Sequence, residues 1–176
     1  MEMTTQELRA AQAPLKELYR SQPNAGMITL KAEGRIGQGI TCIIQTGKAR
    51  VEAGLHPATG GDGTFACSGD MLLEALAACA GVTMAAVATA MGVNLRGGTV
   101  RAEGDLDFRG TLGVSKEAPV GFQSIRLEFE LHTDASSDQI ATLHRLTERY
   151  CVVYQTLRQA PSIDVTMKTQ QAASRK

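Results

Sequence analysis

The alternation of apolar and polar positions along the chain predicts an α+β fold. Apolar residues recur at helical spacing in three segments, namely 5–20, 70–92 and a segment that begins at Ser136 or Ser137 and stops at Pro161. Strand-like alternation marks six segments, namely 27–34, 40–46, 48–55, 99–109, 122–133 and 162–168. The order is therefore helix, strands, long helix, strands, helix, strand, which favours a mostly antiparallel sheet.

The ends of the three helices carry local signals. Pro14 interrupts the first helix, because a proline inside a helix removes a hydrogen bond. Ser68 is a candidate N-cap for the second helix, and Gly92 ends it. Ser136 and Gln139 stand in the register of a capping box and predict the start of the third helix.

The second helix has no charged side chain from Ala75 to Leu95. Its length permits a membrane span, but alanine, glycine and threonine dominate it, and these residues contribute little to membrane insertion. A buried central helix that neighbours approach closely is the simpler interpretation. One modest sheet covers only one side of such a helix, so we expect an obligate homodimer.

Composition and charge exclude some classes of function. The 176 residues contain 18 basic and 18 acidic side chains, a balance that argues against nucleic-acid binding and against attachment to a membrane surface. We expect a helical extension at 1–26, one domain at 27–168 and a polar tail at 169–176. The first residues show no secretory signal, so a cytoplasmic location with reduced thiols is the expectation.

Four cysteines are the candidate reactive groups. Cys42 lies in a predicted strand and Cys67 in a glycine-rich loop, and we interpret both as structural or incidental. Cys79 lies among alanines in the long helix, where a free cysteine usually packs as a small apolar residue. Cys151 follows the segment Ser137–Tyr150 on the face of Ile140 and Leu143, where it also fits a packed core. Arg145 and Arg149, close to it in sequence, instead favour its thiolate.

A metal or phosphate site is not favoured. No two cysteines form a CxxC pair, and neither Cys67, Cys79 nor His56 has a ligand at zinc-binding spacing. We interpret His56, His132 and His144 as histidines of a loop, a strand end and a helix surface. A phosphate-binding loop requires a lysine after its glycines, and no lysine follows the glycine-rich stretch at 60–63.

Two motifs change the interpretation of Cys79 and Cys151. The glycine-rich stretch at 60–69 leads into SGDMLLEALAACAGVTM, and ERYCVVYQTLR follows some seventy residues later. This order resembles the osmotically inducible protein C (OsmC) and organic hydroperoxide resistance (Ohr) family, over about 27–167. The resemblance implies an OsmC-like fold, in which a mostly antiparallel sheet from both chains wraps two long central helices in an intertwined homodimer.

The resemblance also implies an activity and the residues that perform it. Active members reduce organic hydroperoxides with a peroxidatic cysteine, here Cys79, and a resolving cysteine, here Cys151. Arg35 is the positional match for the arginine that assists in the family. Asp70 is the first candidate for the family's acidic residue, and Glu74 is the second. No cofactor is implied; an external dithiol would reopen the disulfide, and neither nucleic acid nor membrane is a partner.

Two positions differ from the usual family pattern. Val152 stands where proline often follows the second cysteine, so the helix is free to continue past Cys151. Asp70 stands where Pro-Glu is typical. These differences keep an alternative open, in which the protein is a non-catalytic dimer of the same fold that binds an apolar small molecule between its long helices.

Overall fold

The structure is a computed structural model that describes residues 4–22, 25, 29, 34–36, 41–45 and 50–169. For Tyr19, 34–36 and 41–45 it describes the backbone alone. The predicted strand 27–34 therefore lies largely outside the described residues, as does the predicted tail beyond Thr169.

Helices and strands alternate in blocks, as the sequence predicts. The helices are α1 (Thr5–Ser21), η2 (Pro57–Thr59), α2 (Ser68–Met91), α3 (Phe108–Thr111), α4 (Ser137–Tyr150) and α5 (Val152–Arg158). The strands are β1 (Gly34–Ile36), β2 (Thr41–Gln45), β3 (Arg50–Gly54), β4 (Ala66–Cys67), β5 (Leu95–Asp105) and β6 (Ser124–Thr133). This mixture confirms the α+β class.

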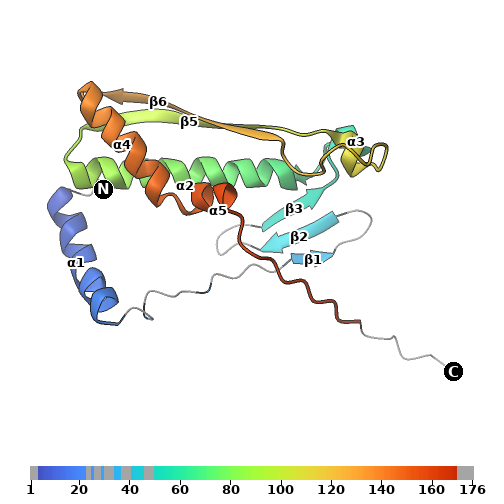
Figure 1. The fold of residues 1–176 in the computed structure, drawn as a ribbon, viewed down its shortest axis with the longest axis horizontal. Coiled ribbons are helices and arrows are strands. Elements are labelled where there is room, and N and C mark those ends of the chain that lie inside the picture. The colour runs from blue at the N-terminus through green and yellow to red at the C-terminus, as the bar shows by residue number, and fades with distance from the viewer. Residues whose placement is uncertain are drawn as a thin grey trace.

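The strands form two sheets around the central helix. One sheet, called the smaller sheet here because its strands are short, has the order β1-β2-β3-β4. It is antiparallel except for the parallel pair of β3 with the two-residue β4. The larger ribbon is the antiparallel pair of β5 and β6. In Figure 1, α2 runs along the middle of the molecule, with the β5–β6 ribbon on one side and the smaller sheet on the other.

The core lies where α2 meets α4 and the ribbon. Met84 and Ala88 of α2 pack with Val93 and with Leu143 of α4, and none of these four is more than 8% exposed. Gly92 ends α2 in the left-handed conformation, at a φ of 69°, which only glycine adopts without strain. Apolar residues at alternate positions of β6 complete this core, namely Phe129 and Leu131.

Only one face of α2 is buried within the protomer. Its buried residues are Leu76, Ala80, Met84 and Ala88, a single stripe at a spacing of four. Val82, on another face, is 72% exposed. By length and composition α2 is able to cross a membrane, but in this fold it is the core helix against β5 and α4. The cover that we predicted for its remaining faces does not come from the described part of this chain.

Helices α1 and α2 each differ from expectation, α1 at its proline and α2 at its N-cap. Pro14 does not interrupt α1, which continues to Ser21. Ala10 and Pro14 are both exposed, so water is able to bind the carbonyl group that the proline leaves without a donor. The N-cap of α2 is Cys67, without a side-chain cap, and Ser68 is already helical.

Two predicted strands are also corrected. The strand expected at 99–109 begins earlier, at Leu95, and ends at Asp105. The Asp107 carboxylate accepts from the Arg109 backbone N–H at 3.0 Å and starts the single turn of α3, which holds Phe108. The segment 162–168 is extended but forms no strand, because no described strand lies beside it.

Candidate active site at Cys79 and Cys151

The third helix predicted from the sequence is broken at Cys151. The capping box of Ser136 and Gln139 starts α4 as predicted, with the Gln139 backbone N–H donating to the serine hydroxyl at 3.3 Å. At Cys151 the backbone turns extended, with a ψ of 108°. The Cys151 N–H donates to Thr147 and ends α4, and its carbonyl accepts from Gln155 and begins α5.

Local contacts hold the break without a proline. Val152 and Val153 are already helical as the first two residues of α5, so the non-helical backbone is confined to Cys151. The Gln155 side chain donates to the Glu148 carbonyl at 2.7 Å and thereby joins the two helices across the corner. Cys151 is therefore held at the N-terminus of α5, where the family's proline would also place it.

The break brings the two cysteines together. The Cys79 and Cys151 thiols are close enough for each to shift the pKa of the other, although 72 positions separate them in sequence. Cys79 is half-buried on α2. Cys151 is 1% exposed and lies at the bottom of the space between α2, α4 and α5. Both are free thiols in this structure.

The surroundings shift the two thiol pKa values in opposite directions. Burial raises the pKa of Cys79, but donors outweigh it: the N–H groups of Val152 and Val153, the Cys151 thiol and the Thr83 hydroxyl. The net pKa of Cys79 lies below its ordinary value. For Cys151, burial raises the pKa, and donation to Cys79 raises it further. Cys79 is therefore the thiol that ionises first.

A cavity reaches Cys151 from the side of β6. It has a volume of about 540 Å³ and lies between α2, β6, α4 and α5. Its walls are mostly apolar side chains, among them Leu76, Ile125, Leu127, Phe129 and Leu157. Such a size and lining are typical of a site for a small apolar molecule.

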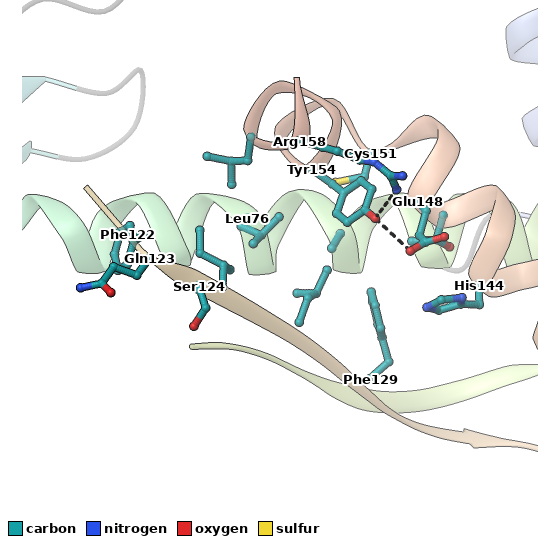
Figure 2. A pocket seen from close by; sticks show the side chains of 15 residues that line it. Leu76, Phe122, Gln123, Ser124, Phe129, His144, Glu148, Cys151, Tyr154 and Arg158 are labelled. Atoms are coloured by element: carbon teal, nitrogen blue, oxygen red, sulfur yellow. Dashed lines mark hydrogen bonds between the residues drawn. The ribbon is translucent and has the colours of Figure 1, made fainter. Parts of the chain in front are cut away.

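One side of this cavity carries a polar chain (Figure 2). The Arg158 guanidinium donates to the Tyr154 hydroxyl at 3.1 Å, and that hydroxyl donates to the Glu148 carboxylate at 3.0 Å. Sequence reasoning missed these residues. The signal was present, because Tyr154 and Arg158 stand three and seven positions after Cys151, on one face of a helix.

The other residues proposed from the sequence lie apart from the thiol pair. Arg35 lies in β1 opposite Ile43, and its side chain is outside the described part of the structure. Asp70 is nine residues before Cys79 on the same helix, about 13 Å along the axis and half a turn around it. It lines a separate cavity with His56 and Cys67. The structure does not bring Asp70 to Cys79 within the protomer.

The remaining cysteines and the histidines lie away from the thiol pair or at its margin. Cys67 is half-buried at the start of α2, and Cys42 lies in β2 with its side chain outside the described residues. His56 caps η2 and stacks on Phe108 at 5.0 Å, as a loop histidine. His132 is exposed near the end of β6, and His144 is exposed on α4 at the cavity. Within the described ranges, no three metal-binding side chains cluster.

Comparisons with known proteins agree with this fold. No curated protein sequence matches the chain. Among solved structures, an OsmC-like protein from Mycoplasma pneumoniae superposes with a TM-score of 0.64 at 16% identity, over 76% of this chain and 89% of that one. An organic hydroperoxide resistance protein OsmC from Legionella pneumophila gives 0.59 at 17%, over 76% and 92%.

A further solved structure carries the same fold. A putative organic hydroperoxide resistance protein from Vibrio cholerae, with captopril in one of its active sites, gives a TM-score of 0.53 at 19% identity, over 78% of this chain and 91% of that one. The model of the OsmC-like protein family matches residues 61–166, which include α2, both long strands and the two cysteines of the site. The chain therefore belongs to the OsmC-like family.

Proposed function

We propose that the protein is a homodimeric thiol peroxidase that reduces organic hydroperoxides, of the alkyl or lipid kind, in the cytoplasm as a defence against oxidative stress. The observation that carries the proposal is the pair of adjacent thiols with opposite pKa shifts, Cys79 lowered and Cys151 raised. Two of the structural relatives, from Legionella pneumophila and Vibrio cholerae, are named as hydroperoxide resistance proteins, which supports the substrate class.

The first step is an attack by the Cys79 thiolate on the peroxide. A thiol with a pKa of about 8.5 is only about 3% ionised at pH 7, so a lowered pKa raises the fraction of the nucleophile. The sulfur bonds to one peroxide oxygen as the O–O bond breaks, and the departing alkoxide takes a proton and leaves as an alcohol. Cys79 is then a sulfenic acid, oxidised by two electrons.

The second and third steps return the enzyme to its reduced form. Cys151 condenses with the Cys79 sulfenic acid, which forms a disulfide and releases water. A dithiol from solution then reduces that disulfide by exchange and becomes oxidised itself, so the cycle needs no bound cofactor. Cys79, with its lower pKa, is the better leaving group in that exchange.

We also propose roles for Arg35 and Asp70 beside the thiol pair. A guanidinium beside the Cys79 sulfur lowers the thiol pKa further, and Arg35 is our candidate for it. A carboxylate is able to hold such a guanidinium in a bidentate pair. Asp70 of the same chain faces away from Cys79, so we assign this role to Asp70 only as a contribution of the second copy in the dimer.

Mass spectrometry tests the two-cysteine cycle. The reduced protein is treated with one equivalent of cumene hydroperoxide, and its tryptic peptides are mapped. We expect a loss of two mass units that maps to a Cys79–Cys151 link. The Cys79→Ser variant must not form it, and the Cys67→Ser variant, whose thiol lies elsewhere, must form it at the wild-type rate. Free thiols at both positions after treatment refute the proposal.

The apolar cavity supports a second candidate function, a non-catalytic dimer that binds an apolar small molecule. Its 540 Å³ and its leucine and phenylalanine walls suit such a ligand without any redox step. An environment-sensitive dye such as 1-anilinonaphthalene-8-sulfonate distinguishes the two candidates. Equal dye binding by wild type and Cys79→Ser, together with no peroxide consumption by the wild type, favours the second.

A further inference from the structure

The short helix α5 is oriented by polar contacts rather than by deep burial. It has seven residues, and isolated helices shorter than about 12–15 residues are marginal in water. Within the part of the chain that the structure describes, no residue of α5 is fully buried. Its orientation therefore depends on the contacts that it makes with α4 and α2.

Glu148 of α4 accepts two hydrogen bonds from α5. Its carbonyl is one of the last four of α4, which lack a donor within their own helix. The Gln155 side chain donates to this carbonyl at 2.7 Å, and the Tyr154 hydroxyl donates to the Glu148 carboxylate at 3.0 Å. Both bonds are partly buried, so water competes with them less than it does at an exposed site.

Arg158 sets the direction of the Tyr154 hydroxyl group (Figure 2). Its guanidinium donates to the tyrosine oxygen at 3.1 Å, which leaves the hydroxyl proton for the Glu148 carboxylate. A hydrogen bond to an ionised carboxylate is stronger than one between neutral groups. Tyr154 therefore links the two helices through a charge-assisted hydrogen bond.

The corner that this bond spans contains Cys151. Glu148 lies three positions before Cys151, and Tyr154 lies three positions after it. Cys151 is the extended residue between α4 and α5, so a rotation of its backbone moves α5 relative to α4 and changes where the thiol lies against α2. The bond between Tyr154 and Glu148 joins the two sides of the corner and opposes this rotation.

We propose that Tyr154 and Glu148 are positioning residues of the thiol pair, and that the hydrogen bond between them keeps the Cys151 thiol next to Cys79. This inference rests on the two-cysteine cycle of the proposed function and names the residues on which its second step depends. When the corner opens, Cys151 is out of reach of an oxidised Cys79. The rate of disulfide formation therefore falls with the fraction of molecules in which the corner is closed.

Disulfide exchange without a peroxide tests the proposal. The protein, with Cys42 and Cys67 both replaced by serine, is treated with dithiodipyridine. The Cys79 thiolate breaks the S–S bond of the reagent, forms a mixed disulfide and releases one thiopyridone. Cys151 then loses its proton to solvent, attacks the Cys79 sulfur and releases the second thiopyridone as the Cys79–Cys151 disulfide forms. The rate of this second release reports how well Cys151 is positioned.

Two tyrosines on either side of Cys151 provide matched variants. Tyr154→Phe removes the hydroxyl that donates to Glu148, whereas Tyr150→Phe removes the hydroxyl of a side chain that is 58% exposed. We expect Tyr154→Phe to slow the second release about threefold to tenfold, the factor that one lost hydrogen bond corresponds to. Tyr150→Phe should leave the rate within about twofold of the wild type. Equal rates for Tyr154→Phe and the wild type overturn the proposal.

Variants of Glu148 separate the hydrogen bond from a general loss of stability. Glu148→Gln keeps a side-chain acceptor for Tyr154 and should retain most of the rate, whereas Glu148→Ala should be as slow as Tyr154→Phe. The double variant Tyr154→Phe/Glu148→Ala should be no slower than either single variant, because all three lack the same bond. Slowing factors that multiply in the double variant, or equal rates for Glu148→Gln and Glu148→Ala, overturn the proposal.

The result is distinguishable from a failure of the proposed function. A protein that consumes no cumene hydroperoxide, but whose second release is slowed by Tyr154→Phe, contradicts the peroxidase function and supports the positioning role. A protein that forms the Cys79–Cys151 link with the peroxide, but exchanges equally fast with and without the Tyr154 hydroxyl, supports the peroxidase function and overturns the positioning role.

Discussion

Cys151 lies beside Cys79 across a break between two helices, and the two thiols shift each other's pKa in opposite directions. The N–H groups of Val152 and Val153, which begin α5, lower the pKa of Cys79. A helix has no internal acceptors for its first N–H groups. Here they stabilise the Cys79 thiolate, whereas Cys151, buried below them, is the weaker acid. Among the described residues, the groups that lower the pKa of Cys79 are backbone N–H groups and uncharged side chains, so the backbone helps to distinguish the nucleophile from its partner.

This polarity predicts the pH dependence of thiol alkylation. The pKa of Cys79 is lowered, so its thiolate already forms below the usual range near 8.5, and its alkylation rate should level off at lower pH than that of Cys151. Stopped-flow reaction with monobromobimane, followed by peptide mapping, measures each site. An inflection for Cys79 at or above that of Cys151 would contradict the assignment.

The Cys151→Ala variant is the control for the contact itself. It removes one of the donors to Cys79 and leaves the N–H groups of Val152 and Val153 in place. The inflection for Cys79 should therefore move toward higher pH. Cys67→Ser, which removes a thiol outside the pair, should leave the inflection unchanged.

The sequence pattern located most of the long elements, whereas the choice of cysteines came from the family resemblance. Alternation located β6, uncharged helical spacing located α2, and the capping box of Ser136 and Gln139 located the start of α4. These signals are local, and each reflects one face buried against a neighbour. The family resemblance then selected Cys79 and Cys151, because periodicity alone assigns both to a packed core.

The failures arise where the structure depends on distant or cooperative contacts. Arg145 and Arg149 lie close to Cys151 in sequence and suggest a lowered pKa, but burial and Cys79 raise it. The assignment of Asp70 relied on its position in a motif, although nine helical residues turn it to the opposite side of α2. For the segment 162–168, alternation predicts a strand, but no described strand lies beside it to pair with.

The core is the site where a truncation should cost most. Leu143 is fully buried between α4 and α2, in contact with the Met84 cluster. Leu143→Ala should lower the free energy of unfolding by about 2–5 kcal/mol, since it removes apolar contacts and leaves a cavity. Ile140→Ala, on the same helix at a position 40% exposed, is the matched control and should cost clearly less. Urea denaturation at fixed protein concentration measures both.

The contribution of Asp105, on the outer face of the β5–β6 ribbon, to the stability of the fold should decrease in acid. Hydrogen bonds from Arg126 and Ser124 hold the pKa of Asp105 well below its usual value of about 3.9. A carboxylate with a lowered pKa stabilises the fold above its unfolded pKa, and this contribution is lost as the pH falls below about 4.

The Asp105→Asn variant tests this acid response. Because Asp105 is exposed, solvent screens its ion pair, so the urea midpoint of the variant should be only slightly lower than that of the wild type at pH 6. The two midpoints should converge as the pH is lowered from 5 toward 3. A difference that widens on acidification would contradict the assigned direction of the pKa shift.

The absence of proline after Cys151 leads to the last prediction. Val152 is 68% exposed at the first position of α5, where proline is well tolerated, and Cys151 already has the extended backbone that precedes a proline. Val152→Pro should therefore keep the fold and leave the thermal midpoint within a few degrees. It also deletes one N–H donor to the Cys79 sulfur, while Val153 keeps its own.

Two readouts should then separate in this variant. The thermal midpoint stays near that of the wild type, whereas the alkylation inflection of Cys79 moves to higher pH because one thiolate donor is lost. Val152→Ala retains the N–H and is the control that should not move the inflection. If Val152→Pro and Val152→Ala give the same inflection, the backbone of α5 does not set the acidity of Cys79. If Val152→Pro unfolds the protein and Val152→Ala does not, the backbone at position 152 does not accept a proline, and the prediction that the break at Cys151 is compatible with one is wrong.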